Sequence, residues 1–241
     1  MRAHWILILA VALAGAGCGD DDGGADGDAS VGIDAPACSP AATLYLNRSG
    51  GTYTAGDPND ATTNTSSVVN GSATLAAWAG GDPLWNEVVT CVQGKLAAYG
   101  VAVTDVDPGA LRHTEIVISG SDSDAVNPGS SGIQWIAPGG CSRIDNTIGF
   151  VFAPTPGSVF GVHCDNALQA FASTAGLEMV TNCEDILSSQ QCGEKAFRDT
   201  DSPCGFNTPA TCTCDPDQTP PAPTTQNSHQ RMLALYGPPC P

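Results

Sequence analysis

The sequence predicts an α+β fold, a twisted mixed sheet over helices, followed by a disulfide-rich C-terminal part. Segments with the two-residue period of strands alternate with segments that have the helical period of about 3.6 residues. Their order is strand, helix, strand, strand, strand, helix, and the first strand–helix–strand unit implies two parallel strands joined by a right-handed crossover. Beyond Asn182 the chain holds six of its 11 cysteines among many Pro, Thr and Asp residues, which predicts little regular structure there.

The first half of the predicted sheet comes early in the chain. Alternating apolar residues predict strands at 43–48 and 101–107. Between them, 83–99 carries one apolar stripe and begins with Pro83, so we expect a helix there. The segment 49–81 is rich in Gly, Ser, Thr and Asn, which favours a long surface loop.

The second half of the sheet is predicted from three later segments. Strands are expected at 113–119 and 146–153, with a short edge strand at 132–136. A second helix is predicted at 165–180, beneath the sheet, and Asp165 suits its N-cap.

The C-terminal part is expected to belong to the same domain. We assign 41–182 to the sheet-and-helix region and 183–241 to a disulfide-rich subdomain. A last short helix is predicted at 227–236.

The N-terminal residues resemble an export signal. The apolar run 5–14 is too short to span a bilayer, so 1–17 is predicted to be a signal peptide. Small residues before Cys18 resemble a bacterial lipobox, although Gly15 stands where the motif usually has Leu. We therefore expect lipidation of Cys18 and a place in the cell envelope, on the outer membrane or cell surface; an ordinary cleaved signal with an unpaired Cys18 is the alternative. The acidic, Gly- and Asp-rich segment 18–40 then forms a flexible tether.

The charge balance excludes one class of partner. The chain has 8 Lys and Arg against 25 Asp and Glu, a net charge of −17. Nucleic-acid binding needs clustered Lys and Arg for phosphate contacts, so no nucleic-acid partner is expected.

Ten cysteines follow Cys18, an even number that is typical of a disulfide framework in an exported chain. A zinc site built on Cys204, Cys212 and Cys214 is the alternative, but this spacing is a poor match to zinc-ribbon motifs. The pairing does not follow from the sequence. The cysteines expected in disulfides are Cys38, Cys91, Cys141, Cys164, Cys183, Cys192, Cys204, Cys212, Cys214 and Cys240.

Short segments from residue 43 onward carry a family resemblance. They are LYLNRSGG at 44–51, ND at 59–60, NTSS at 64–67, WN at 85–86, VTDVDPG at 103–109, GEKAFRD at 193–199, PCG at 203–205 and TQNS at 225–228. Together they resemble a group of cysteine-rich exported bacterial zinc peptidases of the metzincin type. The resemblance implies a metzincin-like fold, in which the second helix carries the motif His-Glu-x-x-His-x-x-Gly-x-x-His that binds zinc and activates water.

This chain departs from that motif at each reactive position. With Gly176 as the anchor, Gln169 and Ser173 stand at the first two ligand positions and Met179 at the third, while Ala170 replaces the Glu. Gln and Ser are weak zinc ligands, and no carboxylate is left as a general base. The segment 183–188, which contains no Met, lies where such peptidases have their Met-turn.

Three functions remain open at this point. We expect an inactive peptidase homologue, with no catalytic or metal-binding residue and no cofactor, which is held at the membrane by Cys18 and could bind a peptide or protein. One alternative is an active metal-dependent endopeptidase that holds zinc with atypical ligands, such as His163 or carboxylates. The other is a structural or interaction lipoprotein. A carboxylate cluster of Glu178, Glu184 and Asp185 is less favoured than a solvated helix end.

Overall fold

The computed structural model describes residues 38–120, 126, 134–152, 160–190, 192–214 and 223–240. One compact unit spans Cys38–Pro241. The predicted signal peptide, the lipidation site Cys18 and the tether up to residue 37 lie outside the described residues. Within the part of the chain that is described, every helix is too short or too polar to cross a membrane.

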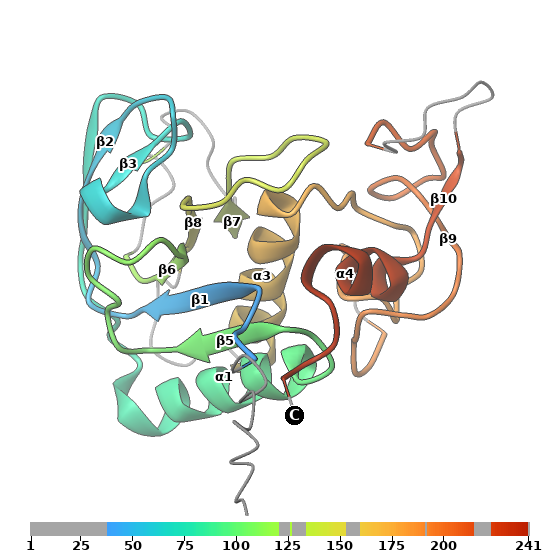
Figure 1. The fold of residues 1–241 in the computed structure, drawn as a ribbon, viewed down its shortest axis with the longest axis horizontal. Coiled ribbons are helices and arrows are strands. Elements are labelled where there is room, and N and C mark those ends of the chain that lie inside the picture. The colour runs from blue at the N-terminus through green and yellow to red at the C-terminus, as the bar shows by residue number, and fades with distance from the viewer. Residues whose placement is uncertain are drawn as a thin grey trace, which may run out of the picture. The chain divides into compact units, whose positions relative to one another are not determined.

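A five-stranded sheet forms the centre of the fold (Figure 1). Four neighbouring strands run parallel, and the fifth, β7, pairs antiparallel with β8 at one edge. The parallel pairing of β1 with β5 agrees with the prediction from the strand–helix–strand order. In spatial order the strands are β5 (Val101–Thr104), β1 (Ala42–Asn47), β6 (Thr114–Ile118), β8 (Ile148–Val151) and β7 (Trp135–Ile136).

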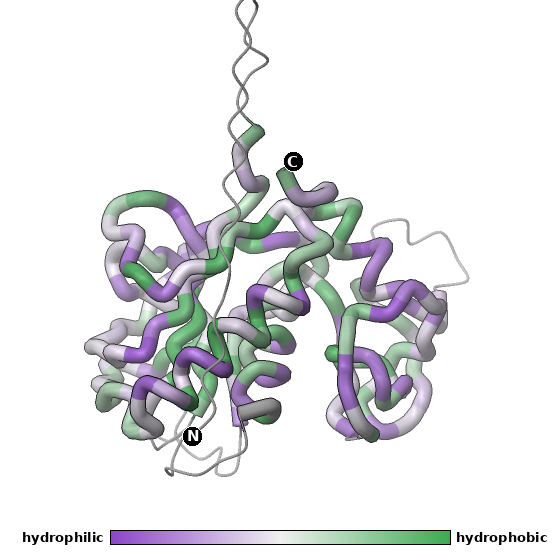
Figure 2. Tube along the Cα trace, turned by 90° about the horizontal axis from the view of Figure 1, so that it is seen from below, coloured by the Kyte–Doolittle hydropathy of each residue, from purple (hydrophilic) through white to green (hydrophobic). Residues whose placement is uncertain are grey.

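Two helices pack on one face of this sheet. Helix α1 (Gly81–Leu96) connects β1 to β5 through the small sheet, and α3 (Phe160–Thr174) follows β8. The apolar side chains of β1 and β6 that point to this face are completely buried with the helical stripes, and each such burial stabilises the fold by roughly 1.5–3 kcal/mol. In Figure 2, green hydrophobic stretches and purple hydrophilic stretches alternate along the trace of the folded body.

Helix α3 is shifted toward the N-terminus relative to the predicted helix at 165–180. Asp165 lies inside the helix rather than at its N-cap, so that prediction is wrong. The helix ends early because Gly176 adopts φ +80°. The amide of Leu177 donates to Ala172 O and that of Gly176 to Ser173 O, the paired bonds of a Schellman motif.

A second, three-stranded sheet covers the opposite face of the main sheet. It consists of β2 (Gly51–Ala55), β3 (Thr65–Ser66) and β4 (Ser72–Leu75), with a short 3-10 helix at Ala61–Thr63. The prediction of a long surface loop at 49–81 is therefore wrong. Tyr53, Ala73 and Leu75 supply enough buried apolar surface for these short strands to pack on the sheet, so both faces of the parallel strands are covered.

The C-terminal part contains little regular structure, as predicted. Two short strands, β9 (Ser202–Pro203) and β10 (Thr225–Gln226), pair antiparallel, and α4 (Ser228–Tyr236) follows directly. Asn227 caps α4 by accepting a hydrogen bond from the amide of Gln230, where the sequence predicted a helix at 227–236. Met232 and Tyr236 bury the apolar side of this helix in the main core.

Candidate functional site

Gln169 lies on α3 and faces the segment 186–188 rather than open solvent. Only 5% of its surface is exposed. Its side-chain amide donates hydrogen bonds to Ile186 O at 2.8 Å and to Ser188 O at 2.9 Å. The residue at the position that the resemblance assigns to the first zinc ligand therefore cross-links the helix to the segment at the Met-turn position.

The side chain of Lys195 contacts the same segment as Gln169. Its ammonium donates to Ser188 O at 2.5 Å, and 1% of the residue is exposed. Burial lowers the pKa of this ammonium, while the charges of Asp165 and Asp185 act in the opposite direction. Gln169 and Lys195 donate to the same oxygen, so their side chains lie close together. A metal cation bound at Gln169 would therefore be repelled by the Lys195 ammonium, and the low dielectric constant of the interior would strengthen this repulsion.

The other motif positions are also engaged in packing. Ala170 is completely buried, and its methyl group lies 3.5 Å from where a Cβ on Gly149 of β8 would be placed. The helix lies close to the sheet here, which requires small residues at both positions. A carboxylate side chain at position 170 would therefore have no space. Ser173 is half-buried, with its hydroxyl 3.2 Å from the position of a Cβ on Gly139. Met179 is half-buried, and its carbonyl accepts a hydrogen bond from the amide of Gly205.

Further charged groups are buried around this cross-link. Lys95 on α1 pairs with Asp165 on α3 at 3.4 Å and also donates to Lys195 O. Burial raises the pKa of the Asp165 carboxyl, and Lys95 opposes that shift. The interface between α1, α3 and the 183–199 segment is thus held by charge-assisted hydrogen bonds.

Asp185 contradicts the expectation of a solvated helix end. It is 0% exposed and accepts hydrogen bonds from the Leu187 amide at 2.9 Å and the Ser228 hydroxyl at 2.7 Å. Burial raises the pKa of its carboxyl, and the two hydrogen bonds oppose this shift. Asp185 therefore links Ser228, the first residue of α4, to the turn at 185–187.

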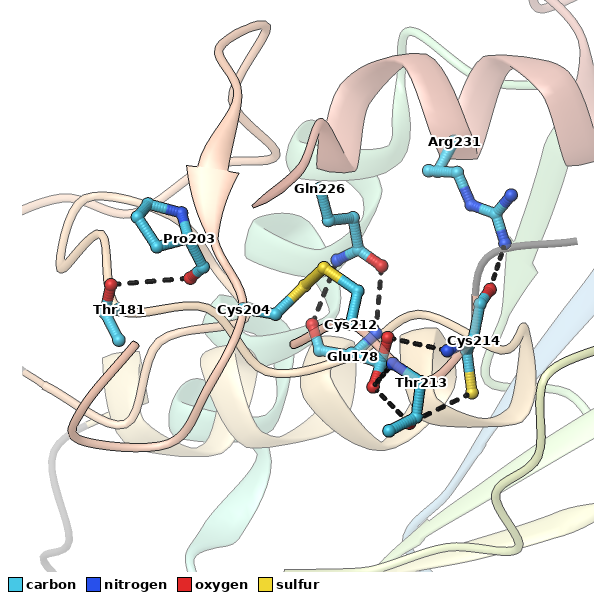
Figure 3. Close-up of a disulfide and its surroundings, with 9 residues drawn as sticks. All are labelled: Glu178, Thr181, Pro203, Cys204, Cys212, Thr213, Cys214, Gln226 and Arg231. Carbon is cyan, nitrogen blue, oxygen red and sulfur yellow. Dashed lines mark hydrogen bonds between the residues drawn. A yellow bond between two sulfur atoms is a disulfide. The ribbon is translucent and has the colours of Figure 1, made fainter. Parts of the chain in front are cut away.

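Glu178 also has a structural role (Figure 3). One carboxylate oxygen accepts from the amide and hydroxyl of Thr213, and the other accepts from the amide of Cys214. Among the described residues, Glu178, Cys204 and Cys212 form the one group of three potential metal ligands, with donor atoms within 4.8 Å of one another. Cys204 and Cys212 form a disulfide, so their sulfur atoms are not available as thiolate ligands.

The three histidines of the described chain do not converge. His163 on α3 is buried against the edge of Trp78, burial lowers the pKa of its imidazole, and its Nδ1 has no hydrogen-bond partner among the described residues. His113 donates from Nδ1 to Leu111 O, and His229 contacts the hydroxyl of Tyr99. They lie on separate parts of the fold, and none joins Gln169 in the described structure.

All ten predicted cysteines form disulfides, as expected from the sequence. Cys91–Cys164 joins α1 to α3, which fixes the two helices under the sheet. The other pairs are Cys38–Cys240, Cys141–Cys214, Cys183–Cys192 and Cys204–Cys212.

Sequence reasoning missed the buried role of Lys195 and Asp185. Both stand in a cysteine-rich stretch without periodicity, and lysine is almost never fully buried unless it is paired.

No family model, curated protein or solved structure matches this chain.

Proposed function

We propose that this chain is an exported, lipid-anchored protein with a metzincin-like fold that has lost peptidase chemistry and acts in the cell envelope by binding peptides or proteins. The order of elements and the position of α3 against the sheet are the features that the resemblance implies. Five disulfides favour an oxidising compartment, which supports export.

The observation that carries the proposal is the cross-link at Gln169. Its amide and the Lys195 ammonium both donate to Ser188 O, so hydrogen-bond donors occupy the first ligand position, where zinc would require an electron-pair donor. A charged lysine beside this position further disfavours a divalent cation.

The binding half of the proposal rests on the edge strand. Within the described residues β7 has β8 as its single strand neighbour, and an extended peptide can add to such an edge through main-chain hydrogen bonds. Hydrogen exchange of the full chain with a random peptide library would test this. We expect selected peptides to protect the amide of Trp135, which points to the free edge because the neighbouring positions 134 and 136 face β8. Failure to select any peptide would refute the binding half.

A structural or interaction lipoprotein is the second candidate, and one observation favours it. Gln169 is buried against 186–188 and does not face an open cleft. If peptide selection fails while the metal test below gives the expected result, this candidate replaces the first.

The loss of chemistry is tested by metal analysis and by restoring the motif. We expect the purified chain to hold no stoichiometric zinc and to show no chelator-sensitive cleavage of a protein substrate. One zinc per chain, or such cleavage, would instead establish an endopeptidase with atypical ligands.

A combined variant tests the metzincin-like geometry itself. It carries Gln169→His, Ser173→His and Met179→His, with Lys195→Met to remove the competing charge. We expect it to bind one zinc ion, whereas Gln93→His on the exposed side of α1 should bind none. A correctly folded variant without zinc would argue against the metzincin-like arrangement.

A further inference from the structure

A cavity of about 360 Å³ opens on the face of the main sheet opposite α1 and α3. It lies between β1, β2, β6 and the turn at 107–109. Tyr45 and Asn47 on β1 and Glu115 on β6 project to this face, because their neighbours Leu44, Leu46 and Ile116 point into the helical core. The volume lies within the range of sites for small ligands.

Glu115 is the most buried charged group of this cavity. It is 3% exposed, and its Oε1 atom accepts hydrogen bonds from Asn47 Nδ2 at 2.7 Å and from the Tyr53 hydroxyl at 3.2 Å. Its Oε2 atom has no hydrogen-bond partner among the described residues. The protein therefore fixes one oxygen of a buried carboxylate at the cavity wall and gives the other no partner among the described residues.

The other polar groups of the wall are uncharged side chains, the Asp107 carboxylate and the His113 imidazole, whose charge when it is protonated favours an ionised Glu115. No Lys or Arg is among the described residues that line the cavity. Asp107 stands at its exposed side, and its charge reaches both Tyr45 and Glu115. His113 donates from Nδ1 to Leu111 O, so in its neutral form the other ring nitrogen is an acceptor. The cavity thus offers acceptors and negative charge to a ligand.

Burial of the ionised Glu115 carboxylate costs free energy, which a bound ligand can offset. Burial raises the pKa of Glu115, while the hydrogen bonds from Asn47 and Tyr53 oppose the shift. An ionised carboxylate in such a site favours a partner that brings both positive charge and hydrogen-bond donors.

The arrangement fits an organic cation better than a metal ion. A metal site needs several ligand atoms close together, and the described Glu115, Asp107 and His113 form no such group. The lining residues instead include Tyr45, whose side chain can contact an alkyl chain.

We propose that this cavity binds an alkylammonium group, with Glu115 Oε2 as its counter-ion and hydrogen-bond acceptor. The group can come from a small free amine or from a lysine side chain of a peptide. The proposal is independent of the zinc motif, because the cavity and α3 lie on opposite faces of the sheet.

An NMR titration of the full chain tests this proposal. The probes are n-butylammonium and neutral 1-butanol, together with acetyl-Gly-Lys-Gly-amide and the same peptide acetylated on the lysine side chain. We expect saturable shifts at the amides of 45–53 and 113–117 with the two cations only. Tighter binding of the peptide would identify lysine side chains as the source, and tighter binding of butylammonium would identify free amines.

Three variants test whether Glu115 is responsible for cation binding. Glu115→Gln should weaken cation binding roughly ten- to hundredfold, as expected for loss of a charge-assisted hydrogen bond. Glu87→Gln, an equal charge change on the exposed side of α1, should leave binding unchanged. Asp107→Asn, at an exposed position, should weaken binding several-fold and serves if Glu115→Gln does not fold. Equal binding of butanol and butylammonium, absence of saturable binding, or unchanged affinity in both cavity variants would overturn the proposal.

Discussion

Replacing Gln169 by Met should destabilise the protein by about 2–4 kcal/mol. Met keeps the length of the side chain but removes both hydrogen bonds, each worth roughly 0.5–1.5 kcal/mol net. Ile186 O then loses its side-chain donor in a buried position, which costs roughly 1–3 kcal/mol, whereas Ser188 O keeps the bond from Lys195.

Urea unfolding followed by circular dichroism measures this change. With a slope of about 1–3 kcal/mol per molar urea, the midpoint should fall by roughly 1 M or more. Gln93→Met on the exposed side of α1 is the matched control, because its amide makes one long bond of 3.4 Å to Val103 O. A Gln169→Met midpoint equal to that of the control would refute the cross-link as the role of Gln169.

Three further predictions concern the disulfide frame, the helix end and the buried carboxylate. Replacing both Cys91 and Cys164 by Ala opens a loop with a sequence separation of 73 and should cost about 4 kcal/mol, measured by urea unfolding. Gly176→Ala should cost roughly 1–2 kcal/mol or more, since φ is +80° and the added Cβ would lie 3.0 Å from the Cys141 carbonyl carbon; thermal melting measures it. The folded-state pKa of Glu115 is raised, so its contribution to stability is full below its unfolded pKa and is lost as pH rises through the folded pKa. Glu115→Gln should therefore be more stable than the unmodified chain at neutral pH, with a difference that shrinks in acid, as seen in unfolding curves at several pH values.

The last two of these predictions have a control in the same chain. Gly94→Ala in α1 has open space around the new methyl group and should stabilise by up to about 1 kcal/mol. Glu87→Gln should show no pH-dependent gain, because Glu87 is exposed. A gain for Glu87→Gln equal to that for Glu115→Gln would assign the effect to net charge rather than to burial.

The main sheet and its helices were predictable because their apolar periodicity is strong. The stripe of Trp85, Val88 and Val92 gives α1, and the run at 146–153 gives β8. The end of α3 was predicted too late, because the apolar pattern continues past Gly176 to Val180, which is buried outside the helix.

The small sheet and the buried charges were not predictable in the same way. Strands β2 and β4 are four or five residues long within a Gly- and Ser-rich segment, so local propensity favours a loop. Only Tyr53, Ala73 and Leu75 of these two strands are buried. Without that sheet, strand alternation places Glu115 on a solvated face. Its burial follows from residues 60 or more positions away, which no local pattern contains.

The segments that carry the sequence resemblance lie on both sides of the main sheet. The segments 44–51 and 103–109 contribute Tyr45, Asn47 and Asp107 to the cavity wall. The segment 193–199 contributes Lys195, which donates to Ser188 O on the side of α3.

The Cys38–Cys240 disulfide has a mechanical consequence. A force applied to the chain before Cys38 reaches the folded body at Cys38, which is covalently bonded to Cys240 in the segment after α4. Force is then divided between β1 and that C-terminal segment, so neither can peel away alone. In the reduced protein the same pull would act on β1 alone, and this inner strand of the sheet would be extracted at a lower force.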